Sequence, residues 1–348
     1  MVDFYPVRTE DGTLSLFNTK INDIYHSKIG AYTEALNKFT LPSGIVEYAK
    51  NSSSISILDV CFGLGYNTRV AINEIWKVNP NCKIHVTGIE IDPYVIACAY
   101  FAGFADENIL SRRVFKRLIL SNPLTRSALL KIYKDVNFNI INTLNNTPFL
   151  KSSFESSTKY NVTSSKQGSL HNIYYRSVSN RNNDKLKLSY YSKLLDITLY
   201  LGDARLILTS LIEPYNFILH DPFTPSVAPS LWSVDLFKEL FRLLDCNGNL
   251  TTYTSSAAVR SGMMEAGFYI GKTNPVGRKS SGTIAYKDSM LITTQLDKNE
   301  QCLLDTNAGI PYYDKELKHT DSEILENRNN IVKQSSRIST SKYLMSIE

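Results

Sequence analysis

Acidic residues follow three separate apolar runs of this chain, at positions where the strands of an open α/β sheet would end. Glu90 ends the run 83–89, Asp203 comes after the run 197–201, and Asp221 follows Phe217-Ile-Leu-His220. Ligands of such sheets bind outside the carboxyl ends of the strands. We therefore expect Glu90 to accept hydrogen bonds from ribose hydroxyls and Asp221 to lie where chemistry occurs. Asp203 would either accept from an adenine amino group or cap the helix that follows it.

A glycine turn precedes these acids in the chain. The apolar run 55–60 is typical of a buried parallel strand, and Gly63 and Gly65 follow it. Glycine lacks a Cβ atom, so such a turn can bend sharply and let a ligand approach the backbone. The spacing of apolar residues then predicts a helix over 68–78. A strand, a glycine turn and a helix together indicate a nucleotide-binding unit.

The same loop narrows the choice of cofactor. The dinucleotide fingerprint G-x-G-x-x-G has Thr68 at its third glycine position here, and the P-loop pattern does not occur. Asp59 lies ahead of Gly63 and Gly65, and Glu90 follows the next strand. This arrangement fits S-adenosylmethionine better than a dinucleotide. A dinucleotide, or a glycine turn without a ligand, remains open on the pattern alone.

The composition limits the class of protein. The chain has 348 residues, of which 43% are hydrophobic, enough for one large domain with an appendage or for two domains. No segment approaches the ~18 consecutive apolar residues of a membrane helix, and the first residues lack the pattern of a signal peptide. The five cysteines are scattered, without the spacing of a zinc or redox site. We expect a cytoplasmic protein with reduced thiols, no metal and no membrane partner.

Positive charge is concentrated in the middle of the chain. Residues 101–196 carry 15 Lys/Arg against 6 Asp/Glu, whereas the remainder has 23 against 27. Such a segment indicates either an anionic partner such as nucleic acid or a solvated helical surface. Within it, the part 151–192 is rich in Ser, Asn, Tyr and Lys with little periodicity, so we assign it no fold. Its tyrosines and basic residues would suit RNA or an ordinary surface loop.

The other elements predict one α/β core with additions at both ends. Strands are expected within 4–17 (as a hairpin) and at 83–89, 197–201, 217–220, 249–254, 267–271 and 283–286, with a turn at Asn247-Gly248. Helices are expected at 31–39, 45–50, 93–101, 110–120, 124–133, 204–211, 233–243, 257–265 and 320–334, with a short element at 137–144. The expected parts are 1–50, capping the cofactor site; 51–104 and 197–295, the core; 105–196, a basic helical and irregular insertion; and 296–348, a C-terminal appendage.

Several runs of residues resemble one family. They are Tyr25-His-Ser-x-x-Gly-Ala31, Asp59-Val-Cys-Phe-Gly-Leu-Gly-Tyr-Asn67, Leu201-Gly-Asp-Ala-Arg205, His220-Asp-Pro-Phe-Thr-Pro-x-x-x-Pro-x-Leu-Trp232, Thr252-Tyr-Thr-Ser-Ser-x-x-Val-Arg260, Glu265-Ala-Gly-Phe268 and Val276-Gly-Arg-Lys279. In these runs the chain resembles the methyltransferase half of the bifunctional MnmC proteins and their stand-alone relatives, which lack the FAD-dependent oxidase domain. The resemblance implies a class I methyltransferase fold, with a mostly parallel seven-stranded sheet ending in an antiparallel pair.

The resemblance also implies an activity. Such proteins use S-adenosylmethionine to methylate the aminomethyl group on the wobble uridine of certain tRNAs, so tRNA and a separate enzyme that makes the aminomethyl group would be partners. Carried over by position, the cofactor residues would be Tyr25, Ser27, Asp59, Gly63, Gly65, Asn67, Glu90 and Asp203. Asp221 would face the substrate amine, and Phe223, Arg278 and Lys279 would contact the substrate.

Two other functions remain open on the sequence. One is a methyltransferase that acts on a protein or a small-molecule amine, because the basic insertion favours RNA only weakly. The other is a non-catalytic RNA-binding protein with the same fold. The presence of Gly63, Gly65, Glu90, Asp203 and Asp221 argues against the second of these, and failure to bind the cofactor would support it.

Overall fold

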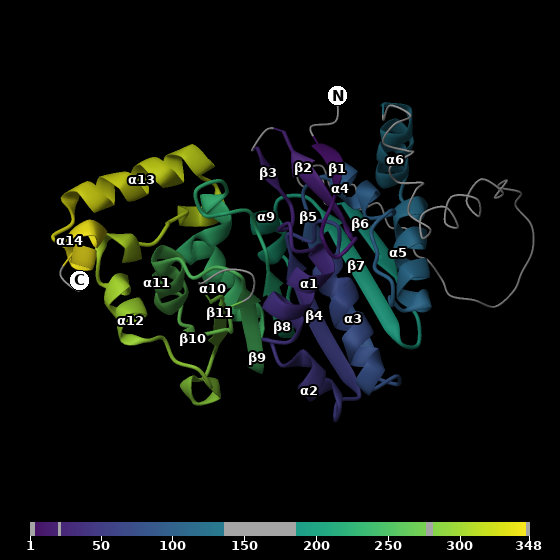
Figure 1. Cartoon of the computed structure of the whole chain (residues 1–348), viewed down its shortest axis with the longest axis horizontal. Coiled ribbons are helices and arrows are strands. Elements are labelled where there is room, and N and C mark those ends of the chain that lie inside the picture. Colours follow the sequence, from purple (N-terminus) through teal and green to yellow (C-terminus); the bar gives the residue numbers. More distant parts are fainter. Residues whose placement is uncertain (1–3, 20–21, 136–185, 276–280, 346–348) are drawn as a thin grey trace, which may run out of the picture.

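The computed structural model describes residues 4–19, 22–135, 186–275 and 281–345. Within these ranges the chain forms an eight-stranded sheet and a three-stranded sheet, with helices packed against the larger one (Figure 1). Outside the described residues lie the predicted element at 137–144, most of the segment 151–192, Arg278 and Lys279. The division of the chain into four functional parts stays a prediction.

The large sheet has the strand order β10-β11-β9-β8-β4-β5-β7-β6. Its strands are β4 (Ser54–Val60), β5 (Lys83–Glu90), β6 (Leu186–Tyr190), β7 (Leu195–Leu201), β8 (Tyr215–His220), β9 (Leu244–Thr252), β10 (Tyr269–Lys272) and β11 (Thr283–Tyr286). The pairs β4–β5, β4–β8, β5–β7 and β8–β9 are parallel, whereas β10, β11 and β6 join by antiparallel pairing. The predicted class I methyltransferase fold is confirmed.

The eighth strand corrects the prediction of seven. The strand β6 was expected to belong to a helical and irregular insertion, but it pairs along its whole length with β7 at the edge of the sheet. Leu188 and Tyr190 point inward from it and are buried. Edge pairing and burial of two side chains decide the structure of a short segment whose flanking sequence shows no periodicity.

The central strand β4 is buried on both faces, as a strand between two helical layers must be. Ile55 and Ile57 pack into one apolar cluster with the helices that follow β4 and β5. Leu58 and Val60 pack into the other, beneath the helices that follow β7 and β8. Because successive side chains of a strand alternate between faces, this single run connects the two halves of the core.

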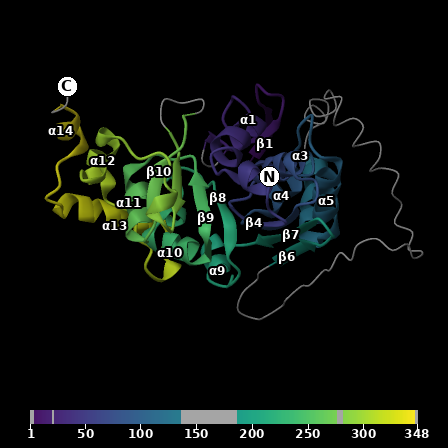
Figure 2. The same ribbon diagram turned by 90° about the horizontal axis from the view of Figure 1, so that it is seen from below.

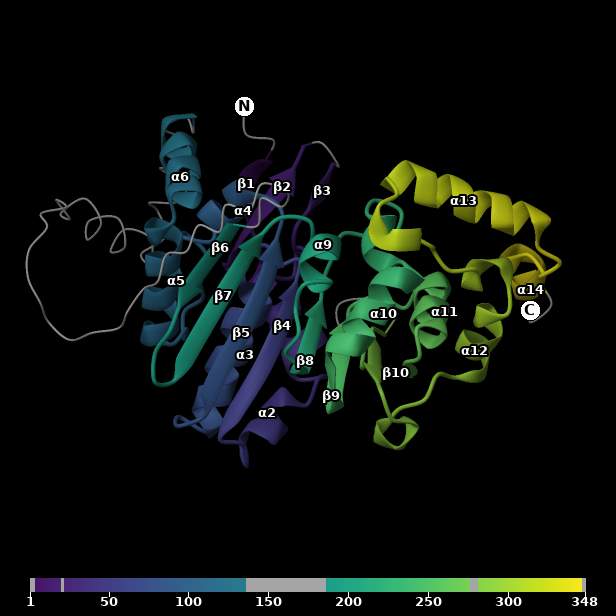
Figure 3. The same ribbon diagram turned by 180° about the vertical axis from the view of Figure 1, so that it is seen from behind.

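Most of the predicted helices are confirmed, with ends shifted by a few residues. Those of the core are α3 (Tyr66–Val78), α4 (Pro93–Cys98), α9 (Ala204–Leu208), α10 (Val234–Leu243) and α11 (Ala257–Glu265), and those of the basic segment are α5 (Ile109–Ser121) and α6 (Pro123–Asp135). The helices α12 (Lys298–Leu304), α13 (Asp321–Gln334) and α14 (Thr340–Met345) belong to the C-terminal appendage. The appendage and α6 lie at opposite ends of the long axis of the molecule (Figures 1 and 3).

The N-terminal hairpin is confirmed and has a third strand. It consists of β1 (Phe4–Arg8), β2 (Leu14–Asn18) and β3 (Asp23–Ile24), and it lies near the end of the large sheet at which the parallel strands finish (Figure 1). The helix predicted over 31–39 begins as α1 (Ala31–Glu34) and continues as the π-helix η1 (Ala35–Thr40), and α2 (Ile45–Ala49) follows. π-Helical turns are rare and occur frequently at functional sites.

The predicted turn at Asn247-Gly248 is wrong. Both residues belong to β9, at a register shift in its pairing with β8. A Cβ atom on Gly248 would lie 2.5 Å from Asn216 O, so glycine here permits a close approach of two strands rather than a turn. Among the described residues, no helix combines the length and apolar character needed to cross a bilayer.

Candidate active site

A cavity of about 460 Å³ opens at the carboxyl ends of the parallel strands and beneath the small N-terminal sheet. Its described lining is strongly acidic. Seven carboxyl groups line it against two cations: Asp23, Glu34, Glu90, Asp92, Asp203, Asp221 and Asp321, with Lys38 and Arg205. An acidic, partly apolar cavity of this size suits an organic ligand with positive charge.

The glycine turn forms one side of the cavity. Cys61 and Gly63 both line it, and both have a left-handed backbone, with φ of 67° and 56°. Nothing lies closer than 3.9 Å to a Cβ atom placed on Gly63, so the backbone here is open to the cavity. Gly65 does not line the cavity. Its φ is 77°, and a Cβ atom would lie 2.4 Å from the Phe62 ring, so the fold itself requires this glycine.

Glu90 binds the glycine turn to the end of β5. Its Oε2 accepts a hydrogen bond from Gly63 N at 2.9 Å, and its Oε1 accepts from Ile91 N at 2.9 Å and Asp92 N at 3.0 Å. Burial raises the pKa of Glu90, and these backbone donors oppose that effect. A carboxylate has about four acceptor positions, so three donors leave room for a ligand hydroxyl. Beside it, Ile91 lines the cavity with 69% of its surface exposed.

Asp203 lines the cavity and is also a helix cap. Its Oδ1 accepts from Arg205 N at 2.9 Å, which caps α9, and its Oδ2 accepts from Arg205 Nη2 at 2.7 Å. The capping role left open by the sequence is therefore present in the structure. The ion pair with Arg205 fixes the orientation of the Asp203 carboxylate in the cavity wall.

The loop that carries Asp221 is held rigidly after β8. Three hydrogen bonds fix it: Asp221 N to Val60 O at 3.2 Å, Tyr253 Oη to Pro222 O at 3.0 Å, and Trp232 Nε1 to Phe223 O at 2.7 Å. The partners of the loop therefore come from the earlier strand β4 and from two later segments of the chain. Such support keeps a side chain within the narrow tolerance that chemistry requires.

The Asp221 carboxyl is partly buried, and within the described ranges a side-chain amide is its hydrogen-bond donor. Asn67 Nδ2 donates to its Oδ2 at 2.9 Å. Burial, together with the negative charge of Glu34, raises the pKa of Asp221 well above its ordinary value. An acid in this environment holds its proton until a cation or a stronger donor arrives. Asn67 was expected to shape the cofactor loop. Its side chain contacts the predicted catalytic residue Asp221 and does not itself line the cavity.

Glu34 and Lys38 form an ion pair at the same end of the cavity. Glu34 Oε2 also accepts from Ser27 N at 2.7 Å, and Lys38 lies in the π-helix η1, 5.9 Å from the centre of the Tyr253 ring. Burial raises the pKa of Glu34, but the charge and hydrogen bond of Lys38 prevail and leave it lowered. The structure therefore places an ionised pair beside the poorly paired Asp221. The sequence contained one signal for this ion pair, because Glu34 and Lys38 lie four residues apart on a predicted helix.

Tyr25 and Ser27 line the cavity near this pair. The Tyr25 ring meets the Phe223 ring edge to face, with centroids 5.1 Å apart. Phe223, predicted to contact the substrate, therefore forms an aromatic wall beside Asp221. Burial raises the pKa of the Tyr25 hydroxyl, so this group stays neutral at ordinary pH.

Asp59 does not reach the cavity lining. It is fully buried, Thr68 Oγ1 donates to its Oδ2 at 2.6 Å, and its Oδ1 has no hydrogen-bond partner within the described parts of the chain. Burial raises the pKa of Asp59 to about 7. Its position behind the glycine turn differs from the predicted direct contact with a cofactor.

The structure thus brings most of the predicted residues to one cavity. Tyr25, Ser27, Gly63, Glu90, Asp203, Asp221 and Phe223 line it. Asp59, Gly65 and Asn67 stand behind these residues, and Arg278 and Lys279 lie outside the described ranges. The functions assigned to them stay predictions. Among the described residues, no group of three or more His, Cys, Asp or Glu is placed to hold a metal ion.

Comparison with known proteins gives this cavity a context. A family model described as an S-adenosyl-L-methionine-dependent methyltransferase matches residues 165–288, a range that includes Asp203 and Asp221. An uncharacterized protein of Methanocaldococcus jannaschii is 28% identical over 323 residues, which cover 92% of this chain and 70% of that protein.

Other relatives carry the name tRNA 5-methylaminomethyl-2-thiouridine biosynthesis bifunctional protein MnmC. The protein from Burkholderia mallei is 26% identical over 261 residues, or 74% of this chain and 31% of the relative. The protein from Ralstonia nicotianae is 37% identical over 99 residues, or 28% of this chain and 15% of the relative. The chain therefore spans less than a third of the length of these bifunctional relatives.

Among solved structures, MnmC2 from Aquifex aeolicus has the same fold. The two chains superpose with a TM-score of 0.65 at 24% sequence identity, covering 96% of this chain and 87% of that one. The sheet order, the matched family model and these relatives agree with one another. Over residues 165–288 this chain matches the model of S-adenosyl-L-methionine-dependent methyltransferases, and over 74% of its length it is similar to proteins named MnmC.

Proposed function

We propose that this protein transfers a methyl group from S-adenosylmethionine to the aminomethyl group of a modified wobble uridine in tRNA. The observation that carries the proposal is the position of Asp221. It is a partly buried carboxyl on a rigid loop, in the same cavity as Glu90 and Asp203. The cavity thus joins acceptors suited to a nucleoside with an acid suited to an amine.

The residues of the cavity fit the cofactor. S-Adenosylmethionine carries a sulfonium and an ammonium group against one carboxylate, and it would supply an electrophilic methyl group. The excess of carboxyl groups in the lining matches that positive charge. The remaining acceptor position of Glu90 suits a ribose hydroxyl, the exposed Ile91 suits the face of a base, and the open backbone at Gly63 gives room beside them.

Asp221 would handle the proton of the substrate amine. A primary amine is mostly protonated at neutral pH, and its nitrogen must lose a proton before it can attack a methyl group. Asp221 would orient the ammonium group, lose its own proton to solvent beside that positive charge, and then accept one proton from the nitrogen. The methylated nitrogen then keeps its two remaining hydrogens as a secondary ammonium. A raised pKa makes Asp221 a stronger base than an exposed carboxylate.

The helices α5 and α6 support an RNA substrate over a small amine. Residues 109–135 carry seven Lys/Arg and one Asp/Glu, and Arg113, Arg117, Arg126 and Lys131 are exposed. Burial and the neighbouring guanidinium groups of Arg112 and Arg69 lower the pKa of Lys116 to about 8, a sign of local positive charge.

The position of these helices relative to the cavity also favours RNA. The Lys131 ammonium lies 5.4 Å from the centre of the Tyr94 ring, in the first turn of α4, whose N-cap Asp92 lines the cavity. Figure 3 shows α6 projecting past the end of the sheet at which the cavity lies. A basic surface beside an acidic pocket suits an RNA backbone whose modified base enters the pocket.

The test is methyl transfer from radiolabelled S-adenosylmethionine to tRNA from cells that lack the modification, followed by nucleoside analysis. We expect label on the methylated aminomethyl uridine, and none on a transcript that carries ordinary uridine. Label on a protein or a small amine, with none on tRNA, would show the alternative substrate class and contradict the proposal.

Charge reversal on α5 separates RNA binding from chemistry. We expect Arg113→Glu with Arg117→Glu to weaken tRNA binding and to reduce its salt dependence by about one unit of log–log slope per lost phosphate contact. Binding of S-adenosylhomocysteine should not change. The matched control is Lys298→Glu with Lys333→Glu, exposed positions on the C-terminal appendage. An equal loss of tRNA affinity in both double variants would contradict an RNA surface on α5.

A further inference from the structure

The C-terminal appendage reaches the cavity through the first residue of α13. Asp321 lines the cavity beside Ser230, and its Oδ1 accepts a hydrogen bond from Ser230 N at 3.0 Å. Most of the appendage lies at the far end of the molecule from the basic helices α5 and α6 (Figure 2). The contact therefore links the cavity to a region that follows the methyltransferase core in sequence.

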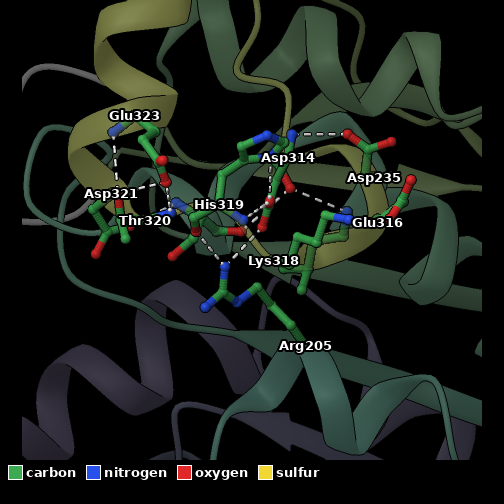
Figure 4. A network of polar contacts seen from close by, with 12 residues as sticks. Arg205, Asp235, Asp314, Glu316, Lys318, His319, Thr320, Asp321 and Glu323 are labelled. Atoms are coloured by element: carbon green, nitrogen blue, oxygen red, sulfur yellow. Dashed lines mark hydrogen bonds and ion pairs between the residues drawn. The ribbon is translucent and has the colours of Figure 1, made fainter.

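Arg205 makes a second and stronger link. Its Nε and Nη2 donate to the Asp203 carboxylate at 3.2 and 2.7 Å. On the other side its Nη1 donates to Asp314 Oδ2 at 2.9 Å and to His319 O at 2.7 Å, as Figure 4 shows. One planar guanidinium thus joins a carboxylate of the cavity wall to a turn of the appendage. These hydrogen bonds raise the pKa of Arg205 beyond its already high value, so the link stays charged.

The turn that receives Arg205 is built around a buried acid. Asp314 is fully buried, its Oδ1 accepts from His319 N at 2.8 Å, and its own N donates to Asp235 Oδ2 at 2.8 Å. Between its ends, Glu316 and Leu317 have φ of 62° and 55°, a left-handed backbone that such side chains rarely adopt. Backbone strain of this kind persists only where the surroundings hold it, and it often marks functional sites.

The arrangement requires the geometry of arginine. A buried Asp314 would be strongly unfavourable without a charged partner, so it holds the guanidinium in one place. The guanidinium in turn holds Asp203, because its forked donors fix a carboxylate in one orientation, which the single ammonium of lysine cannot do. The orientation of Asp203 therefore depends on a residue that is distant in sequence.

We propose that the segment 310–324 forms a wall of the cofactor pocket, and that Arg205 and Asp314 are positioning residues that hold Asp203 towards the bound cofactor. The inference rests on the cofactor placement of the proposed function, but not on its tRNA substrate. The appendage is then part of the binding site, and cofactor binding and ordering of this turn stabilise each other.

Calorimetry with S-adenosylhomocysteine tests the link without any methyl acceptor. We expect Arg205→Lys and Asp314→Asn each to raise the Kd about tenfold or more. The matched control is Arg242→Lys. Arg205 lies in the first turn of α9. Arg242 donates to Leu208 O at 3.0 Å at the other end of the same helix, so it attaches α9 without touching the cavity wall. The control should bind as the wild-type protein does. Wild-type affinity in both test variants, or an equal loss in the control, would overturn the inference.

A double-mutant cycle separates positioning from general destabilisation. Asp203→Asn removes the group that Arg205 is proposed to hold. In that background we expect Arg205→Lys to change the Kd for S-adenosylhomocysteine by less than about twofold, because nothing remains to be oriented. If the two losses multiply instead, Arg205 acts independently of Asp203 and the positioning role is wrong.

Hydrogen exchange on the unaltered protein gives a readout that no folding defect can disturb. The amide of His319, which donates to Asp314, should exchange more slowly when S-adenosylhomocysteine is bound, whereas amides in α5 should not change. Unchanged exchange over 314–324 on saturation would contradict the wall. If the protein binds S-adenosylhomocysteine but methylates no tRNA, the proposed substrate fails while this inference stands.

Discussion

The two ends of the cavity hold carboxyl groups in different states of pairing. At one end, Glu90 accepts three backbone N–H groups and Asp203 is fixed by Arg205. At the other end, the Asn67 amide donates to Asp221, and burial together with the nearby charge of Glu34 raises the pKa of Asp221. The first pair consists of oriented acceptors, whereas Asp221 has a raised pKa and a side-chain amide as its donor.

In the proposed function, this difference would let one cavity both hold a ligand and accept a proton. Acceptors that position a ligand work best when they are charged and already oriented, so the protein surrounds them with donors. A group that accepts a proton needs a pKa near the working pH, and the protein obtains it by withholding donors and water. Three substitutions test whether the two ends behave in these different ways.

The largest effect is expected from Asp221→Asn. The amide keeps the shape of the side chain but cannot accept a proton, so turnover should fall about 10²–10⁴-fold. Affinity for S-adenosylhomocysteine should stay within about threefold of the wild type, because binding does not use the proton acceptor. Single-turnover kinetics and calorimetry measure the two quantities. Near-normal turnover would remove Asp221 from the mechanism and with it the distinction between the two ends.

A smaller effect, on cofactor affinity and not on the rate of turnover, is expected from Glu90→Gln. The amide keeps one acceptor oxygen for Ile91 N and Asp92 N but places an NH2 donor against Gly63 N, so the glycine turn loses its anchor. Hydrogen bonds to a charged group contribute about 1.5–3 kcal/mol, so the Kd for S-adenosylhomocysteine should rise roughly 10–100-fold. At saturating cofactor the rate of methyl transfer should recover most of its wild-type value. A lasting loss of rate would mean that Glu90 acts in the chemistry as well.

The smallest effect on function is expected from Asp59→Asn, which lies behind the cavity. Burial raises the pKa of Asp59 from 3.8 to about 7, so the folded protein holds a proton that the unfolded chain releases above pH ~4. Unfolding then releases this proton, and the wild-type stability decreases as pH rises from about 4 to about 7. The variant lacks this penalty, which is on the order of a few kcal/mol.

Thermal unfolding of both proteins from pH 4 to pH 8 measures that difference. We expect the melting temperature of the variant to exceed that of the wild type at pH 8, and the two values to converge at pH 4. Affinity for S-adenosylhomocysteine should hardly change. A variant that is less stable at pH 8 would mean that Asp59 is ionised and useful in the folded state, in contrast to Asp221.

Much of the fold could be predicted because its signals are local. The apolar run of β4, the glycine turn and the periodic helix α3 each follow from neighbouring residues, and so do the caps of α10 and α13 at Ser233 and Thr320. The failures have non-local causes. β6 forms because β7 offers an unpaired edge, and Gly248 lies in β9 because Asn216 of the neighbouring strand approaches it closely.

The sequence by itself determined which residues could bind and react. Gly63, Glu90, Asp203 and Asp221 follow apolar strands, and parallel strands bring their carboxyl ends to one edge of a sheet. Local pattern therefore sufficed to place them in one cavity.

Only the tertiary structure decided the pKa values and the ion-pair partners of those residues. The charges of Glu34, at the end of α1, and of Lys38, in the π-helix η1, act on Asp221, and Asp314 of the C-terminal appendage pairs with Arg205. The pKa of a carboxyl group depends on burial and on charges within a few ångströms, and both are set by segments that are distant in sequence. Residue type selects the chemistry that is possible, and packing selects which acid is a fixed acceptor and which one can take a proton.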